Sequence, residues 1–213
     1  MAIIYPRALS SSLKIQAEDF RVERSENVNR RRGGKTQVSE RADPRWFVDW
    51  ETYKMDMDEF QDLEAWLLSL RGGLKSFLAY RHERPYPKDY RFGFNGLSKH
   101  FGGAFTGTCV VDAIAQTGLT VSGLPSTFSV RAGDMIGLIQ SGKYGLHVVL
   151  EDAIASAGAV SLLVEPFIKT NIFSTAATAN FAQPLCEMIL TSYSGPRSIE
   201  LETVSITAVQ KIY

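Results

Sequence analysis

Three consecutive residues, Gly34-Lys35-Thr36, match the last positions of a phosphate-binding loop. In such a loop the backbone amides hold phosphates, while the Lys and Thr side chains reach phosphate and metal. The rest of the pattern is missing, because its first glycine would fall on Asn29. Pro44 and an extended segment around Trp46 then follow where the loop requires a helix. The sequence therefore does not favour nucleotide binding.

Other side chains capable of acid-base, metal or nucleophilic chemistry are present, but their spacing does not suit it. Carboxylates cluster where a helix is expected to begin, and the helix dipole favours them there without any catalytic role. The histidines are scattered, so no two of them share one helical face as metal ligands would, and there is no Gly-x-Ser-x-Gly turn. We therefore expect no enzyme, no catalytic residue, no cofactor and no metal. The carboxylates are Asp56, Asp58, Glu59, Asp62 and Glu64, and the histidines are His82, His100 and His147.

The two cysteines, Cys109 and Cys186, are too few for a disulfide scaffold or a structural zinc site. Both lie in apolar, strand-like contexts. Because a free cysteine behaves as a small hydrophobic residue, we expect two buried, reduced thiols.

Two groups of residues could bind something at the surface, and each has a structural alternative. Between Tyr80 and Phe92, aromatic and basic residues are interleaved, and Tyr86, Tyr90 and Phe92 could stack on sugars or bases. They could equally pack over a sheet edge or a neighbouring subunit. The second group is a basic run, which could be a solvated loop tip, a contact with a neighbouring subunit or the lining of a pore. This run consists of Arg30, Arg31, Arg32 and Lys35.

The elements around these groups are mostly strands. Trp46, Val48 and Trp50 alternate with polar neighbours, which predicts a strand over residues 45–54 with one buried face. Residues 24–45 contain few apolar side chains, so they form a long exposed connection or a hairpin with a mobile tip. Trp46 and Trp50, together with Trp66, are expected to be core or interface anchors.

One helix is expected, over residues 56–71. Asp56 or Asp58 can cap its start, and Gly72-Gly73 can end it. Apolar residues recur at helical spacing, so this helix must pack on a sheet or on another subunit. These residues are Phe60, Leu63, Leu67 and Leu70, with Trp66 widening the stripe.

Residues 105–170 contain short apolar runs separated by turn residues, which predicts a small all-β module. Within it, His147–Leu150 and Val160–Val164 are expected to pair as the two strands of a hairpin. If the last strands complete a sheet begun by the first, this module is inserted into a domain made of residues 1–104 and 171–213. The chain is therefore expected to be mainly β, with one α-helix.

Composition excludes several classes of protein. The 213 residues carry 23 basic and 23 acidic side chains, so the chain lacks the basic surface that phosphate-backbone binding usually requires. The longest late apolar run, Val160–Val164, is far short of a membrane span of about 20 residues. We expect neither sequence-specific nucleic acid nor a membrane as a partner.

The order of these features resembles the distal tail proteins of long-tailed bacteriophages and related gene transfer agents. The resemblance lies in Arg45-Trp46 opening a strand, the acidic-capped helix that runs through Asp62–Gly72, and the aromatic strand Phe77–Tyr80. An inserted module containing Arg131–Asp134 and a final strand, Val204–Val209, complete the order. The match covers residues 36–80 and 180–213.

The resemblance implies a structural virion protein of the tail tip, or baseplate. In that family the terminal segments and the helix form a belt domain, a split β-barrel that assembles into a hexameric ring. The ring joins the tail tube to the tail-tip hub and receptor-binding proteins, and DNA can pass through it. For this chain the resemblance implies assembly in the host cytoplasm. Candidate contacts with a neighbour or the lumen are Arg30, Arg31, Arg32, Lys35, Trp46 and Trp66. The alternatives are another tail component, such as a tube or hub subunit, and a carbohydrate-binding module.

Overall fold

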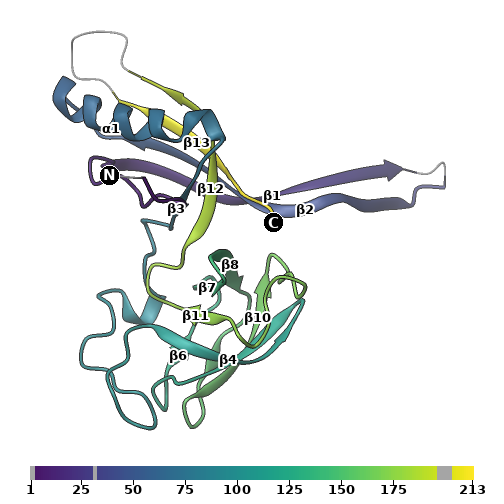
Figure 1. Ribbon diagram of the computed structural model, residues 1–213. Helices are drawn as coiled ribbons and strands as arrows, with labels where there is room; N and C mark the ends of the chain where they lie inside the picture. The colour runs from purple at the N-terminus through teal and green to yellow at the C-terminus, as the bar shows by residue number, and fades with distance from the viewer. Residues whose placement is uncertain (1–2, 31–32, 196–202) are drawn as a thin grey trace. The chain divides into compact units, whose positions relative to one another are not determined.

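The computed structural model describes residues 3–30, 33–195 and 203–213. It is mainly β, with 48% of residues in strands and 9% in helical conformation. The described residues contain one α-helix and one closed β-barrel, which confirms the expected fold class (Figure 1). No helix among them is long and apolar enough to cross a membrane.

The chain divides into two compact units. The arm unit consists of Ser11–Leu74 and Ile189–Ile212. The barrel unit consists of Met1–Ser10, Lys75–Met188 and Tyr213. The long central segment of the barrel unit therefore interrupts the arm unit in the sequence.

A five-stranded sheet has the order β1-β2-β13-β12-β3. The division between the units runs through β12, and β3 belongs to the barrel unit. Along β2 the side chains alternate as the sequence predicts, with Trp46, Val48 and Trp50 buried and Asp49 and Glu51 exposed. The strands are β1 (Ile15–Arg30), β2 (Thr36–Thr52), β3 (Ser76–Ala79), β12 (Cys186–Ser194) and β13 (Ser205–Gln210).

The predicted helix is α1 (Met57–Ser69). Its N-cap is Asp56, whose side chain accepts a hydrogen bond from the Glu59 amide at 2.8 Å. The face that contains Leu63, Trp66 and Leu67 is buried, which confirms the predicted stripe. Because the acidic residues lie in the first turn, they also interact favourably with the helix dipole.

The end of α1 approaches β12 closely. Residues Arg71–Gly73 form a 3-10 turn with positive φ at all three positions. A Cβ on Gly73 would lie 2.6 Å from the Leu190 carbonyl oxygen, so only glycine fits there without a shift. At the other end of the helix, the Phe60 ring lies 3.0 Å from the position of a Cβ on Gly195. The helix therefore packs along β12 of its own unit.

The barrel closes in the order β10-β5-β4-β11-β7-β8. The expected hairpin pairing of His147–Leu150 with Val160–Val164 holds at one position only, where Val164 lies opposite Val149. Val160–Leu163 pair with β5 instead. A separate two-stranded sheet joins β6 (Ser129–Val130) to β9 (Ala153–Ile154). The barrel strands are β4 (Thr108–Ala115), β5 (Gly118–Ser122), β7 (Met135–Gln140), β8 (Lys143–Val149), β10 (Ala159–Glu165) and β11 (Thr178–Asn180).

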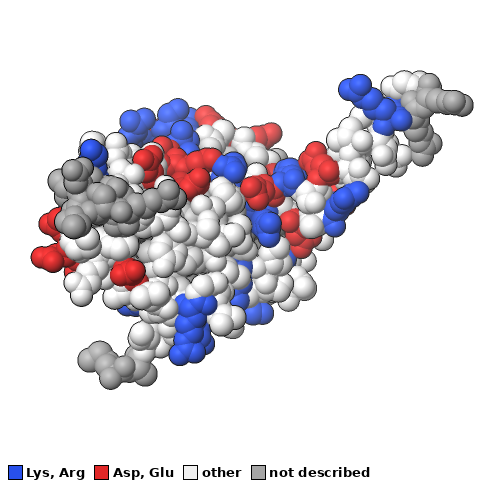
Figure 2. Space-filling model, turned by 90° about the horizontal axis from the view of Figure 1, so that it is seen from above, with Lys and Arg blue, Asp and Glu red and all other residues white. Residues whose placement is uncertain are grey.

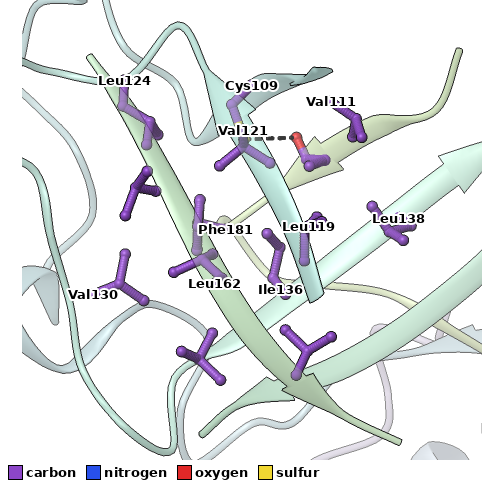
Figure 3. Close-up of a cluster of buried hydrophobic side chains, with 14 of the residues drawn as sticks. Cys109, Val111, Leu119, Val121, Leu124, Val130, Ile136, Leu138, Leu162 and Phe181 are labelled. Atoms are coloured by element: carbon purple, nitrogen blue, oxygen red, sulfur yellow. Dashed lines mark hydrogen bonds between the residues drawn. The ribbon is translucent and has the colours of Figure 1, made fainter. Parts of the chain in front are cut away.

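The core of the barrel unit is a continuous cluster of buried aliphatic and aromatic side chains (Figure 3). Cys109 belongs to it and donates a weak hydrogen bond to the Ala179 carbonyl oxygen at 3.6 Å. Burial raises the pKa of the Cys109 thiol to about 12 and also raises that of Cys186. Both cysteines are free and buried, as expected.

The boundaries of this unit differ from the expected module of residues 105–170. Residues 75–104 and 171–188 also belong to it. The physical reason is that aromatic rings from these flanks complete the core: Phe94 comes from the first flank, and Phe173 and Phe181 from the second. Phe128 contacts Phe94 and Phe181, with ring centroids 5.9 and 5.4 Å away.

Candidate assembly surface

Residues 24–45, here called the arm, form the outer part of the β1–β2 hairpin. The strands pair antiparallel from Ser25 opposite Ala42 to Arg30 opposite Thr36. The hairpin is thus the correct one of the two expectations for this segment, and residues 31–32 at its end lie outside the described part of the chain. β13 pairs with β2 only over Phe47–Glu51, so it does not reach the arm.

The arm has no buried surface of its own beyond its base. Among its described residues, Pro44 alone is buried. The seven residues from Arg24 to Arg30 span about 23 Å, at roughly 3.3 Å per residue. Figure 1 shows this hairpin extending beyond the other strands of its sheet. Both faces and both edges of the ribbon are therefore open to a partner.

The two faces of the arm differ chemically because side chains alternate along each strand. One face carries a pair of exposed valines directly opposite each other, Val28 and Val38, which are 55% and 56% exposed. Glu26 and Glu40 lie next to them on the same face, as do Arg30 and Thr36. Over the paired residues 27–29 and 37–39, the other face carries Asn27, Asn29, Gln37 and Ser39, which are polar and uncharged.

The charges on the arm do not stabilise it strongly. Glu26 lies directly opposite Glu40, and like charges in that position are destabilising. Arg24 lies 3.5 Å from Glu40, but both side chains are exposed, so this ion pair contributes little. Isolated two-stranded hairpins are at best marginally stable in water. The arm therefore depends on its base, or on a partner, to hold its form.

The base of the arm is anchored in the arm unit. The rings of Phe20 and Trp46 pack with centroids 5.3 Å apart. The Trp46 amide donates to the Gln210 side-chain oxygen at 3.1 Å, and Trp50 Nε1 donates to Glu18 at 2.8 Å. These contacts hold β2 where the arm leaves the sheet.

Two of the predicted contact residues lie inside the chain rather than on its surface. Trp46 and Trp66 are 2% and 4% exposed and belong to the hydrophobic core. Of the two expectations for these tryptophans, the structure places them in the core, because each lies on the buried face of its strand or helix.

The two described residues of the basic run lie near the end of the arm. Arg30 and Lys35 are exposed, and neither forms an ion pair with a residue that the structure describes. Arg31 and Arg32 lie outside the described residues. Figure 2 shows basic side chains near the end of the arm and both signs of charge closer to its base. Lys35 and Thr36 lead into a strand, so they do not form the helix start that a phosphate-binding loop needs.

The aromatic stretch from Tyr80 to Phe92 mostly packs within the barrel unit. The Tyr90 ring stacks on Phe128 with centroids 4.5 Å apart, and its hydroxyl accepts a hydrogen bond from the Ser129 amide. Tyr86 meets Phe94 edge to face. Only Phe92, at 98% exposed, stands free of this packing. The structure therefore does not bring the three rings together as a sugar-stacking platform.

The histidines and carboxylates are not assembled into a centre of known chemistry. Residues 3–30, 33–195 and 203–213 contain no group of three or more His, Cys, Asp or Glu that could hold a metal ion. Asp56 caps its helix. His147 is buried within the barrel unit, and its Nδ1 lies 2.7 Å from the Pro166 carbonyl oxygen.

One polar cluster joins two segments that no pattern in the sequence connects. Asp134 accepts hydrogen bonds from the backbone amides of Lys88 and Arg131, both at 2.8 Å. The Arg131 side chain bridges Asp89 at 2.8 Å and Asp152 at 3.1 Å. Burial raises the pKa of the Asp134 carboxyl. The residues Arg131–Asp134 are typical of a turn, so that part of the cluster has a local signal. The hydrogen bond between Asp134 and the Lys88 amide joins segments that are 46 residues apart, and no local pattern predicts it.

Comparisons with models of known protein families and with curated proteins give no match for this chain.

Proposed function

We propose that this chain is a structural virion protein that forms a ring at the distal end of a phage-type tail, with six subunits as the resemblance implies. The ring would join the tail tube to the tail-tip hub and receptor-binding proteins. The observation that carries the proposal is the arm, a ribbon in which Pro44 is the one buried residue among those that the structure describes. The ordered features that resemble distal tail proteins supply the biological setting.

The physical argument begins with the edges of the ribbon. An exposed strand edge pairs readily with another chain. The arm presents such edges on β1 and on the part of β2 that β13 does not cover. In a closed ring every subunit presents the same two surfaces, one to each neighbour. One arm per chain is therefore sufficient to link all the subunits. A net charge of zero also allows like subunits to approach without strong repulsion.

The exposed valine pair suggests which face a neighbour covers. Val28 and Val38 are the apolar centre of one arm face, while the neighbouring residues on the other face, Asn27, Asn29, Gln37 and Ser39, are uncharged and polar. Complete burial of a fully exposed valine contributes about 1.5–3 kcal/mol. Because Val28 and Val38 are only about half exposed, the burial of each contributes about half of that. We infer that a neighbouring copy covers the valine face.

The experiment compares three proteins at high concentration by analytical ultracentrifugation and negative-stain microscopy. The unaltered chain is expected to form closed rings. The double variant Val28→Ser with Val38→Ser should associate at least tenfold more weakly. Val110→Ser is the matched control, because Val110 is also exposed on a strand, at 59%, but lies in the barrel unit. A strictly monomeric chain whose arm folds back onto its own unit would refute the proposal.

Imaging of an assembled particle separates the tail components from one another. Many stacked rings of this protein would identify a tube subunit, and one ring at the tip supports the proposed distal position.

A further inference from the structure

A pocket of about 370 Å³ lies on the barrel unit. It is formed where the loop around η2 (Lys88–Tyr90) meets the turn before β7. Its lining combines cations, a tyrosine and a methionine, and includes the turn that Asp134 caps. The residues that give it its character are Arg84, Tyr86, Lys88, Arg91, Asp134 and Met135.

The pocket has a surplus of positive charge. Arg84, Lys88 and Arg91 line it, and none of them forms an ion pair with a residue that the structure describes. Of the two carboxylates in the lining, Glu83 is already paired with Arg81 at 3.1 Å. The other, Asp134, is engaged by two backbone amides. The lining therefore carries three cations against two carboxylates, and neither carboxylate forms an ion pair with any of the three.

The walls of the pocket are held in place before any ligand arrives. The Asp134 bond to the Lys88 amide ties the loop to the turn, and the Pro85 carbonyl oxygen accepts from the Gln183 amide at 2.7 Å. A Cβ on Gly133 would lie 3.8 Å from Arg84 Nη1, so this guanidinium lies over the glycine. A site with fixed walls loses less conformational entropy when it binds.

We propose that this pocket binds a phosphate or carboxylate group carried on a compound of monosaccharide size. Guanidinium groups match the paired oxygens of both anions, and the Lys88 ammonium adds a point charge. The volume lies at the small end of the range for ligand pockets. The Tyr86 ring and Met135 supply apolar contact for the body of the ligand. Neither the ring nor the arm is needed for this binding.

The test is a titration of the full chain, followed by amide chemical shifts of Gly133 and Met135. Galacturonate and glucose 6-phosphate are the anionic probes, and galactose is the neutral probe. Both anions should shift these signals, with an affinity at least tenfold above that of galactose. The double variant Arg84→Gln with Arg91→Gln should lose at least tenfold, because charge-assisted hydrogen bonds are removed. Lys99→Gln, on the same unit but outside the pocket lining, should bind as the unaltered chain does.

The source of the anionic group is resolved by adding tetragalacturonate. Tighter binding than galacturonate identifies units of a polymer, and equal binding identifies the free compound. The proposal is overturned if galactose binds as well as the anions. It is also overturned if no probe binds, or if the double variant keeps full affinity while its amide spectrum shows the native fold. Ring formation is measured in a separate experiment. A chain that forms no ring could therefore still bind the anionic probes in this pocket.

Discussion

His147 should make the barrel unit lose stability in mild acid. The side chain is buried, with Nδ1 2.7 Å from the Pro166 carbonyl oxygen. Its other nitrogen, Nε2, is buried without a hydrogen-bond partner among the described residues. Burial lowers the pKa of His147 from 6.5 to about 4. A proton on this ring would therefore bring an uncompensated charge into the core.

The size and sign of the effect follow from this difference in pKa. Between pH 6.5 and about 4, the unfolded chain binds a proton at this position and the folded chain does not. The free energy of unfolding therefore falls as the pH is lowered through that window. At 1.36 kcal/mol per unit, His147 should cost about 2 kcal/mol between pH 7 and pH 5, and about 3 kcal/mol by pH 4.

The matched variant is His147→Asn, which retains a donor for the Pro166 carbonyl oxygen but cannot titrate. Urea unfolding would be followed through the amide signals of Val149 and Val164 between pH 7 and pH 4. The variant loses some packing at pH 7, so the comparison uses the change with pH rather than the absolute stability. If the two proteins lose stability in parallel as the pH falls, the argument about His147 is wrong.

Three further substitutions test the packing described above by urea unfolding. Asp56→Ala should reduce the stability of the arm unit by about 1 kcal/mol through loss of the N-cap, whereas Asp56→Asn should have little effect. Gly73→Ala should lower the free energy of unfolding by more than 1 kcal/mol, because the φ of this residue is positive and the new Cβ would meet the Leu190 carbonyl oxygen. The control Gly72→Ala, where a Cβ has open space, should lower it by less. Phe128→Ala should destabilise the barrel unit by about 3–5 kcal/mol. Tryptophan fluorescence reports the variants of the arm unit, since all three tryptophans lie in it. Phe128→Ala lies in the barrel unit and is followed through the amide signals of Val149 and Val164.

The elements that could be predicted are those whose signals are local. The helix over residues 57–69 has its cap, its acidic first turn and its apolar spacing within one short segment. The strand with Trp46 and Trp50 shows its buried face through simple alternation. For the same reason the long exposed segment was recognisable as a possible hairpin, since it lacks apolar residues to bury.

What could not be predicted depends on contacts between distant segments. The barrel closes through β11, a strand of three residues that pairs with both β4 and β7. Nothing local distinguishes Thr178–Asn180 from a loop. Phe94 and Phe181 likewise look like loop residues in the sequence, and only the fold places them in one core. The cationic pocket has the same origin, because it joins residues 83–91 to residues 132–135.

The last strand of the arm unit's sheet, β13, is synthesised near the end of translation. The Val204 amide donates to Thr52 Oγ1, which joins positions 152 residues apart. At a translation rate of roughly 5–20 residues per second, that separation corresponds to about 8–30 s of synthesis. During this interval the β2 edge that will pair with β13 has no strand beside it, while the ribosome makes all the strands of the barrel. The base of the arm thus gains its full support only after those strands exist.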